Sequence, residues 1–129
     1  MPPALTTLKA KRAQVLVVED DQEIRDTLRE VLEDHGYEVI WAENGAEALD
    51  RLRGALSPRL ILLDLMMPVM DGWEFSKALR AEPRLAGIPV VIISADHGLE
   101  QKTSALAVDG YLAKPFHLDA LLATVNRYR

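Results

Sequence analysis

The sequence predicts a single α/β domain in which helices cover both faces of a parallel sheet. Five short apolar runs recur along the chain, and segments with helical periodicity stand between them. Because strand and helix alternate in this way, we expect right-handed crossovers and a doubly wound sheet. A chain of 129 residues is of the right size for one such domain. Chain order alone does not fix the order of the strands.

The apolar runs predict the strands. Four of the five are rich in Val, Ile or Leu and lack strict alternation, which is typical of strands buried on both faces. Pro58 and Pro89 stand just before or at the start of a run, where proline is tolerated. The predicted strands cover residues 15–18, 39–42, 60–63, 90–93 and 111–113.

Apolar stripes at helical spacing predict the helices. Gly36 follows the first stripe, where a left-handed residue is wanted, and Asn44 and Gly45 open the second helix. The stripes consist of Ile24, Leu28, Val31, Leu32 and His35; Ala48, Leu49 and Leu52; Phe75 and Leu79; Leu99, Thr103 and Leu106; and Leu118, Leu121, Leu122 and Val125.

Composition excludes several classes of function. The net charge of −5 argues against a nucleic-acid-binding face, which needs clustered Lys and Arg. The absence of cysteine excludes disulfides, thiolate catalysis and Cys-ligated zinc. Residues 1–13 are interpreted as an N-terminal arm without a signal-peptide-like apolar stretch, and no apolar run approaches a membrane span. We therefore expect a cytoplasmic protein that binds neither nucleic acid nor membrane.

Reactive side chains follow four of the five predicted strands. Glu19 and Asp20 follow the first strand, and Asp64 follows the third. Ser94 follows the fourth and Lys114 the fifth. In open parallel sheets, ligands bind beyond the carboxyl ends of the strands. These side chains are therefore expected to converge on one edge of the sheet.

Such a set suits phosphoryl transfer. Crowded carboxylates repel each other unless a cation neutralises them, and oxygen ligands without His or Cys select a hard ion such as Mg²⁺. A carboxylate beside that ion can attack phosphorus and form an acyl phosphate. The charge on the phosphoryl oxygens then needs a cation and a hydrogen-bond donor, which Lys114 and Ser94 can supply.

Four motifs stand in order at the predicted strand ends: VLVVEDD over residues 15–21, LLDLMMPVMDG over 62–72, ISA over 93–95 and YLAKPF over 111–116. This set resembles the signature of response-regulator receiver domains of two-component signalling. The resemblance extends over roughly residues 14 to 127, and it implies a receiver domain over residues 14–129. It also implies a flavodoxin-like sheet with strand order 2-1-3-4-5.

The resemblance implies a role for each acidic residue. Asp64 would accept the phosphoryl group, and Asp20 and Asp64 would bind Mg²⁺. Glu19 would complete the acidic pair and act on the ion through water, while Met66 would contribute its backbone carbonyl. Asp21 is interpreted as a helix N-cap rather than a metal ligand.

The resemblance also implies a switch. Lys114 would contact the phosphoryl oxygens, and its bond to Pro115 would be cis. Ser94 would bond to the phosphate, and the orientation of Tyr111 would follow Ser94. The implied donor is a sensor histidine kinase or phosphotransfer protein, and the implied reader is a downstream protein effector or a second copy in a homodimer. The domain would catalyse its own phosphorylation and dephosphorylation, without turning over an external substrate.

Three alternatives stay open at this point. A receiver-like interaction module that is never phosphorylated would usually have lost one of the reactive residues. A Mg²⁺-dependent phosphohydrolase would want a second acid two residues after the nucleophile, where Met66 stands. A flavin-binding protein would need a hydroxyl- and glycine-rich phosphate loop after the first strand. The sequence departs from the family pattern at residues 107–109 and at His117, outside the reactive set.

Overall fold

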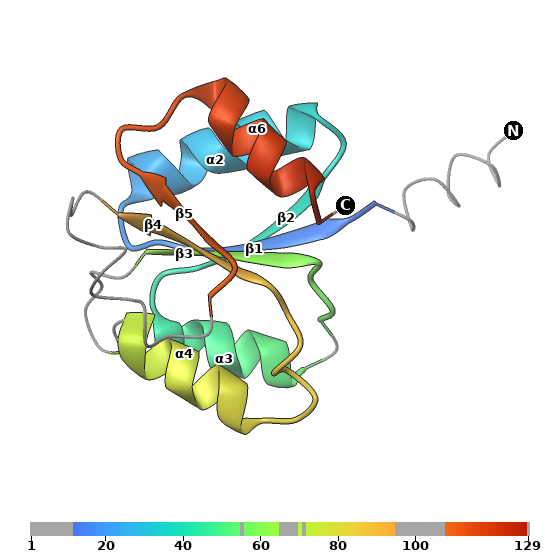
Figure 1. Cartoon of the computed structure of the whole chain (residues 1–129), viewed down its shortest axis with the longest axis vertical. Helices are drawn as coiled ribbons and strands as arrows, with labels where there is room; N and C mark the ends of the chain where they lie inside the picture. The colour runs from blue at the N-terminus through green and yellow to red at the C-terminus, as the bar shows by residue number, and fades with distance from the viewer. Residues whose placement is uncertain (1–11, 55, 65–69, 71, 95–107, 129) are drawn as a thin grey trace, which may run out of the picture.

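The computed structural model describes residues 12–54, 56–64, 70, 72–94 and 108–128. Its five strands form one parallel sheet in the order β2-β1-β3-β4-β5, which confirms the predicted doubly wound topology (Figure 1). The predicted strand positions are confirmed to within about one residue at each end. The strands are β1 Gln14–Val18, β2 Glu38–Ala42, β3 Leu60–Asp64, β4 Val90–Ser94 and β5 Gly110–Ala113.

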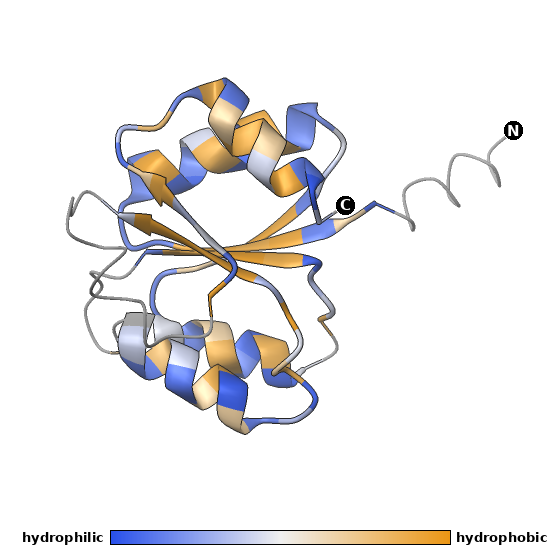
Figure 2. Cartoon of the chain, in the orientation of Figure 1, coloured by the Kyte–Doolittle hydropathy of each residue, from blue (hydrophilic) through white to orange (hydrophobic). Residues whose placement is uncertain are grey.

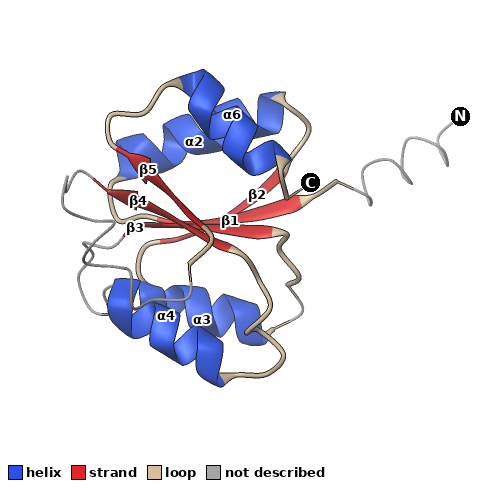
Figure 3. Cartoon of the chain, viewed as in Figure 1, coloured by secondary structure: helices blue, strands red, loops and turns tan. Residues whose placement is uncertain are grey.

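Two layers of helices enclose the sheet. The described helices are α2 Gln22–Asp34, α3 Gly45–Arg53, α4 Gly72–Ala81 and α6 Leu118–Asn126. In Figure 3, α2 and α6 cover one face of the sheet and α3 and α4 cover the other. The helical stripe predicted over residues 99–106 lies outside the described residues. Among the described helices, none combines the length and the apolar character needed to cross a membrane.

Local hydrogen bonds explain where the helices begin and end. The Asp21 carboxylate accepts bonds from the backbone N–H groups of Glu23, at 2.9 Å, and Ile24, at 3.3 Å. Asp21 is therefore the N-cap of α2, as predicted. Asn44 caps α3 in the same way, by accepting from the Glu47 N–H at 2.9 Å. Gly36 follows α2 with a φ of 89°, a left-handed conformation that glycine adopts without strain.

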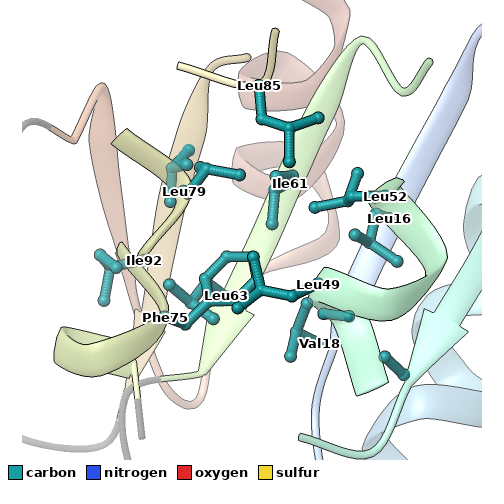
Figure 4. Close-up of a cluster of buried hydrophobic side chains, with 13 residues drawn as sticks. Leu16, Val18, Leu49, Leu52, Ile61, Leu63, Phe75, Leu79, Leu85 and Ile92 are labelled. Atoms are coloured by element: carbon teal, nitrogen blue, oxygen red, sulfur yellow. The ribbon is translucent and has the colours of Figure 1, made fainter. Parts of the chain in front are cut away.

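Each face of the sheet contributes to its own hydrophobic core. Successive side chains of a strand point to opposite faces, so Leu16 and Val18 pack toward α3 and α4, whereas Val15 and Val17 pack toward α2 and α6. Figure 2 shows the apolar strands lying between the two helical layers. Figure 4 shows the core under α3 and α4, where Phe75 lies among aliphatic side chains that include Leu49, Leu63 and Ile92.

The prediction that four strands are buried on both faces holds for three of them. Strands β3 and β4 are buried at every residue, and β1 is buried from Val15 onward. Strand β2 is only half-buried at Val39, Ile40 and Trp41, so the prediction was wrong for it. The reason is its position at the edge of the sheet, where one side has no neighbouring strand.

Candidate functional site

The strand register brings the carboxyl ends of four strands to one edge of the sheet. Val18 pairs with Leu63, so the residues that follow them, Glu19 and Asp64, are neighbours. Asp64 in turn pairs with Ile93, the residue before Ser94. Because Ser94 itself pairs with the last residue of β5, Lys114 follows directly at the same edge. The strand register therefore places these residues at one edge of the sheet, as expected.

Three carboxylates form a tight cluster at this edge. One oxygen from each of Glu19, Asp20 and Asp64 lies within 4.8 Å of the others. Glu19 and Asp64 are buried, with 1% and 5% of their surface exposed, whereas Asp20 faces solvent. Negative charges at this separation repel strongly, because burial removes the water that would screen them. The cluster therefore favours the binding of a cation.

Lys114 already neutralises part of this charge. Its Nζ donates a hydrogen bond to Glu19 Oε2 at 3.0 Å and lies 3.6 Å from Asp64 Oδ2. The Lys114 backbone N–H also donates to the Ser94 carbonyl at 2.8 Å, which fixes the chain at this point. The peptide bond between Lys114 and Pro115 is cis, as the resemblance implied.

Glu19 has an unusual affinity for a proton. Burial of its carboxylate is the main cause that raises its pKa from 4.5 to about 7. The hydrogen bond from Lys114 acts in the opposite direction, and the negative charge of Asp64 adds to the rise. At neutral pH a bound cation and a proton therefore compete for the same buried carboxylate.

The structure describes two of the other three predicted site residues. Ser94 is 2% exposed and ends β4 at the edge that holds the cluster. Tyr111 is half-buried, lies opposite Ile92 in the register, and packs against the core under α3 and α4. The predicted coupling between Ser94 and Tyr111 stays a prediction. Met66 lies outside the described residues.

Sequence reasoning missed Arg25. One guanidinium nitrogen, Nη1, donates to the backbone carbonyl of Glu19 at 3.0 Å and to that of Asp20 at 3.4 Å. These bonds run from α2 to the turn that carries two members of the cluster. The sequence shows only that an arginine stands on the next helix. Its bonds go to main-chain carbonyls, which every residue has, so no pattern of residue types indicates them.

The donor set of the cluster fits a hard divalent cation. It consists of carboxylate oxygens alone, from Glu19, Asp20 and Asp64, with Asp20 open to water. Mg²⁺ prefers oxygen ligands and keeps several of its waters, so a partly exposed acidic site suits it better than a closed cage. The residues present are therefore compatible with the predicted Mg²⁺.

Comparison with known proteins agrees with this arrangement. The model of the response regulator receiver domain family matches residues 15–126. The response regulator MprA of Mycobacterium sp. (strain KMS) is 38% identical over 115 residues, which are 88% of this chain and 49% of MprA. The chain thus spans about half the length of the curated relatives it matches.

Solved structures show the same fold. The chemotaxis protein CheY4 of Vibrio cholerae is 37% identical, has a TM-score of 0.83, and is matched over 92% of this chain and 99% of its own. The receiver domain of the sensor histidine kinase PA1611 of Pseudomonas aeruginosa PAO1 is 26% identical, with a TM-score of 0.81 and coverage of 91% and 97%. That structure holds a magnesium ion coordinated in its active-site cleft. The chain belongs to the family of response regulator receiver domains.

Proposed function

We propose that this receiver domain takes a phosphoryl group onto Asp64 in a Mg²⁺-dependent reaction. The donor would be the phosphohistidine of a sensor histidine kinase or a phosphotransfer protein. One observation carries the proposal: Asp64 lies in a cluster of three carboxylates within 4.8 Å of each other, and the Lys114 ammonium is 3.6 Å from its Oδ2. The proposed nucleophile, the proposed cation site and the positive charge of Lys114 therefore lie side by side.

The chemical step forms one bond and breaks one. A carboxylate oxygen of Asp64 attacks phosphorus while the phosphorus–nitrogen bond of the phosphohistidine breaks. The electron pair of that bond remains on the imidazole nitrogen, and a proton on the other ring nitrogen makes the departing imidazole neutral. Asp64 then carries an acyl phosphate, which water later hydrolyses to the free carboxylate and inorganic phosphate.

The acidic cluster would hold the metal. Asp20 and Asp64 are proposed as direct ligands, Glu19 as a ligand through water, and the Met66 carbonyl as a further ligand. When bound, Mg²⁺ supplies positive charge to the phosphoryl oxygens and offsets the repulsion among the carboxylates. The exposure of Asp20 leaves room for water on the open side of the cluster.

Lys114 and Ser94 would stabilise the phosphorylated state. The Lys114 ammonium pairs with Glu19 and is already near Asp64, so a phosphoryl group on Asp64 brings new oxygens within its reach. Ser94 ends the neighbouring strand at the same edge, and its hydroxyl can donate to the phosphate. A shift of Ser94, followed by Tyr111, would alter the surface near α6 for a downstream effector or a second copy in a homodimer.

Labelling by a small phosphodonor tests the proposal. We expect acetyl phosphate and Mg²⁺ to add one phosphoryl group to the parent protein and none to Asp64→Asn, as measured by intact mass. Asp21→Asn is the matched control, because it neutralises an adjacent acid that caps α2 and keeps a good N-cap. That control should be labelled like the parent.

Equal labelling of Asp64→Asn would place the nucleophile elsewhere. A parent that is never labelled, even with a phosphorylated kinase or phosphotransfer protein, would favour the alternative of an unphosphorylated interaction module. The division into an arm over residues 1–13 and a receiver over 14–129 stays a prediction, as does the cytoplasmic location.

A further inference from the structure

We propose that Arg25 is a positioning residue that holds the acidic turn formed by Glu19 and Asp20 in the geometry needed to bind the cation. The inference rests on the proposed function, because it concerns the metal site of that function. It assigns a role to a residue of α2 whose side chain donates to main-chain carbonyls of the turn.

The first support is the pair of bonds from Arg25 to the turn. Nη1 donates to the Glu19 carbonyl at 3.0 Å and approaches the Asp20 carbonyl at 3.4 Å. Both carbonyls belong to residues whose carboxylates join the cluster. Because Asp20 is exposed, packing does little to fix its position, and these bonds restrict the backbone that carries it.

The second support is the contact between Arg25 and the Trp41 ring. Its guanidinium carbon lies 4.5 Å from the centre of the Trp41 ring, which is the distance of a cation–π contact. Trp41 immediately precedes Ala42, and the Ala42 carbonyl accepts a bond from the Glu19 N–H at 3.0 Å. The acidic turn is therefore bonded to β2 through Ala42, and Arg25 contacts both the turn and the neighbouring Trp41 of β2.

The chemistry of arginine explains the choice of residue. A planar guanidinium can stack on an aromatic ring and still donate along its edge to nearby carbonyls, whereas a lysine ammonium is a compact point charge. Arg51 also lies over Trp41, with its guanidinium carbon 5.6 Å from the ring centre, and it pairs with Glu47 at 3.4 Å. Arg51 therefore shares the Trp41 ring with Arg25, but its described side-chain bond goes to Glu47 on its own helix.

The direction in which Mg²⁺ affinity changes when Arg25 is removed distinguishes a positioning role from an effect of its charge. A positive group beside a cation site repels the ion, so removing Arg25 for its charge alone would strengthen Mg²⁺ binding. Removing the bonds that hold the turn would weaken Mg²⁺ binding instead, because the ligands would sample other positions. The proposal predicts the second result.

The test is a calorimetric titration of the full chain with Mg²⁺. We expect Arg25→Ala to raise the Kd for Mg²⁺ by about 10-fold, in the range found for groups that orient metal ligands. Arg51→Ala and Arg29→Ala are matched controls, because each removes a nearby positive charge that pairs with a glutamate and not with the turn. Both controls should bind Mg²⁺ as tightly as the parent or slightly more tightly.

Two further variants make each outcome decisive. If the melting curve of Arg25→Ala shows that it does not fold, Arg25→Lys takes its place, because lysine retains the positive charge. Weaker Mg²⁺ binding by Arg25→Lys than by the parent supports the positioning role. Mg²⁺ binding equal to that of the parent overturns it. Asp64→Asn tests the underlying site. If it loses Mg²⁺ binding while Arg25→Ala binds like the parent or more tightly, only the role of Arg25 is overturned. If Asp64→Asn binds Mg²⁺ like the parent, the proposed metal site and this inference both fail.

Discussion

The core under α3 and α4 and the acidic edge of the sheet lie next to each other but are stabilised in opposite ways. In the core, Phe75 and Leu63 are fully buried among apolar side chains, so every contact favours the folded state (Figure 4). At the edge, Glu19 and Asp64 are equally buried but carry like charges. Their burial opposes folding unless a proton, Lys114 or a metal ion offsets it.

This difference separates stability from function in the same strand. Leu63 and Asp64 are consecutive residues of β3, and the first belongs to the core while the second belongs to the cluster. A parallel sheet places its apolar length between helices and its carboxyl end at an open edge. Substitutions on the two sides of that boundary should therefore have effects of opposite sign on the metal-free protein.

The largest expected effect is in the core. Phe75→Ala should lower the free energy of unfolding by about 3–5 kcal/mol, because it removes a fully buried ring and leaves a cavity. Urea denaturation would measure the loss, and Leu118→Ala is the control, since Leu118 is 48% exposed. If both variants lost the same stability, burial of Phe75 in this core would not be what stabilises the fold.

The next effect is the pH dependence at the acidic edge. The pKa of Glu19 is about 7 in the folded state, whereas its ordinary value, which applies to the unfolded chain, is 4.5. Between pH 4.5 and 7 the folded protein therefore binds more protons than the unfolded chain does. The free energy of unfolding of the metal-free protein therefore contains a Glu19 contribution that is complete below pH 4.5 and is lost as the pH rises through 7. We expect a loss of about 1–3 kcal/mol.

Glu19→Gln provides the control for this pH effect. Glutamine resembles the protonated acid but does not titrate, so its stability should fall less between about pH 5 and about pH 8. Urea denaturation in the presence of a chelator, at several pH values, would measure the difference between the parent and the variant. Parallel curves for the two proteins would show that Glu19 does not titrate in this window.

The fold could be predicted from the sequence because its signal is local. Each buried strand is a short apolar run, so strand positions were predicted to about one residue. The half-burial of Val39 and Ile40 was not predicted, because the position of β2 at the edge depends on pairing between distant segments. Chain order by itself contains no such information.

The candidate site was predictable in its membership but not in its contacts. Glu19, Asp64 and Lys114 could be brought together because each stands at, or directly after, the carboxyl end of a strand of one parallel sheet. The hydrogen bond between Glu19 and Lys114 joins residues 95 positions apart, so only the folded register reveals it. The contacts of Arg25 involve carbonyl oxygens, which every residue possesses, and so no residue pattern could indicate them.

The smallest expected effect concerns Asp20, the exposed member of the cluster. Asp20→Asn should raise the free energy of unfolding of the metal-free protein by less than about 1 kcal/mol, because it relieves repulsion that water already screens. Saturating Mg²⁺ should then reverse the order. The parent gains stability by binding the ion only in the folded state, whereas Asp20→Asn has lost a ligand and gains less.

Thermal melts with a chelator and with Mg²⁺ would measure both parts of the Asp20 prediction. Asp26→Asn is the matched control, because it removes an exposed acid of α2 that lies outside the cluster. Its response to Mg²⁺ should equal that of the parent. If Asp20→Asn gained as much stability from Mg²⁺ as the parent, the ion would be held without Asp20. The acidic edge would then depend on its two buried carboxylates, and its contrast with the core would rest on Glu19 and Asp64 alone.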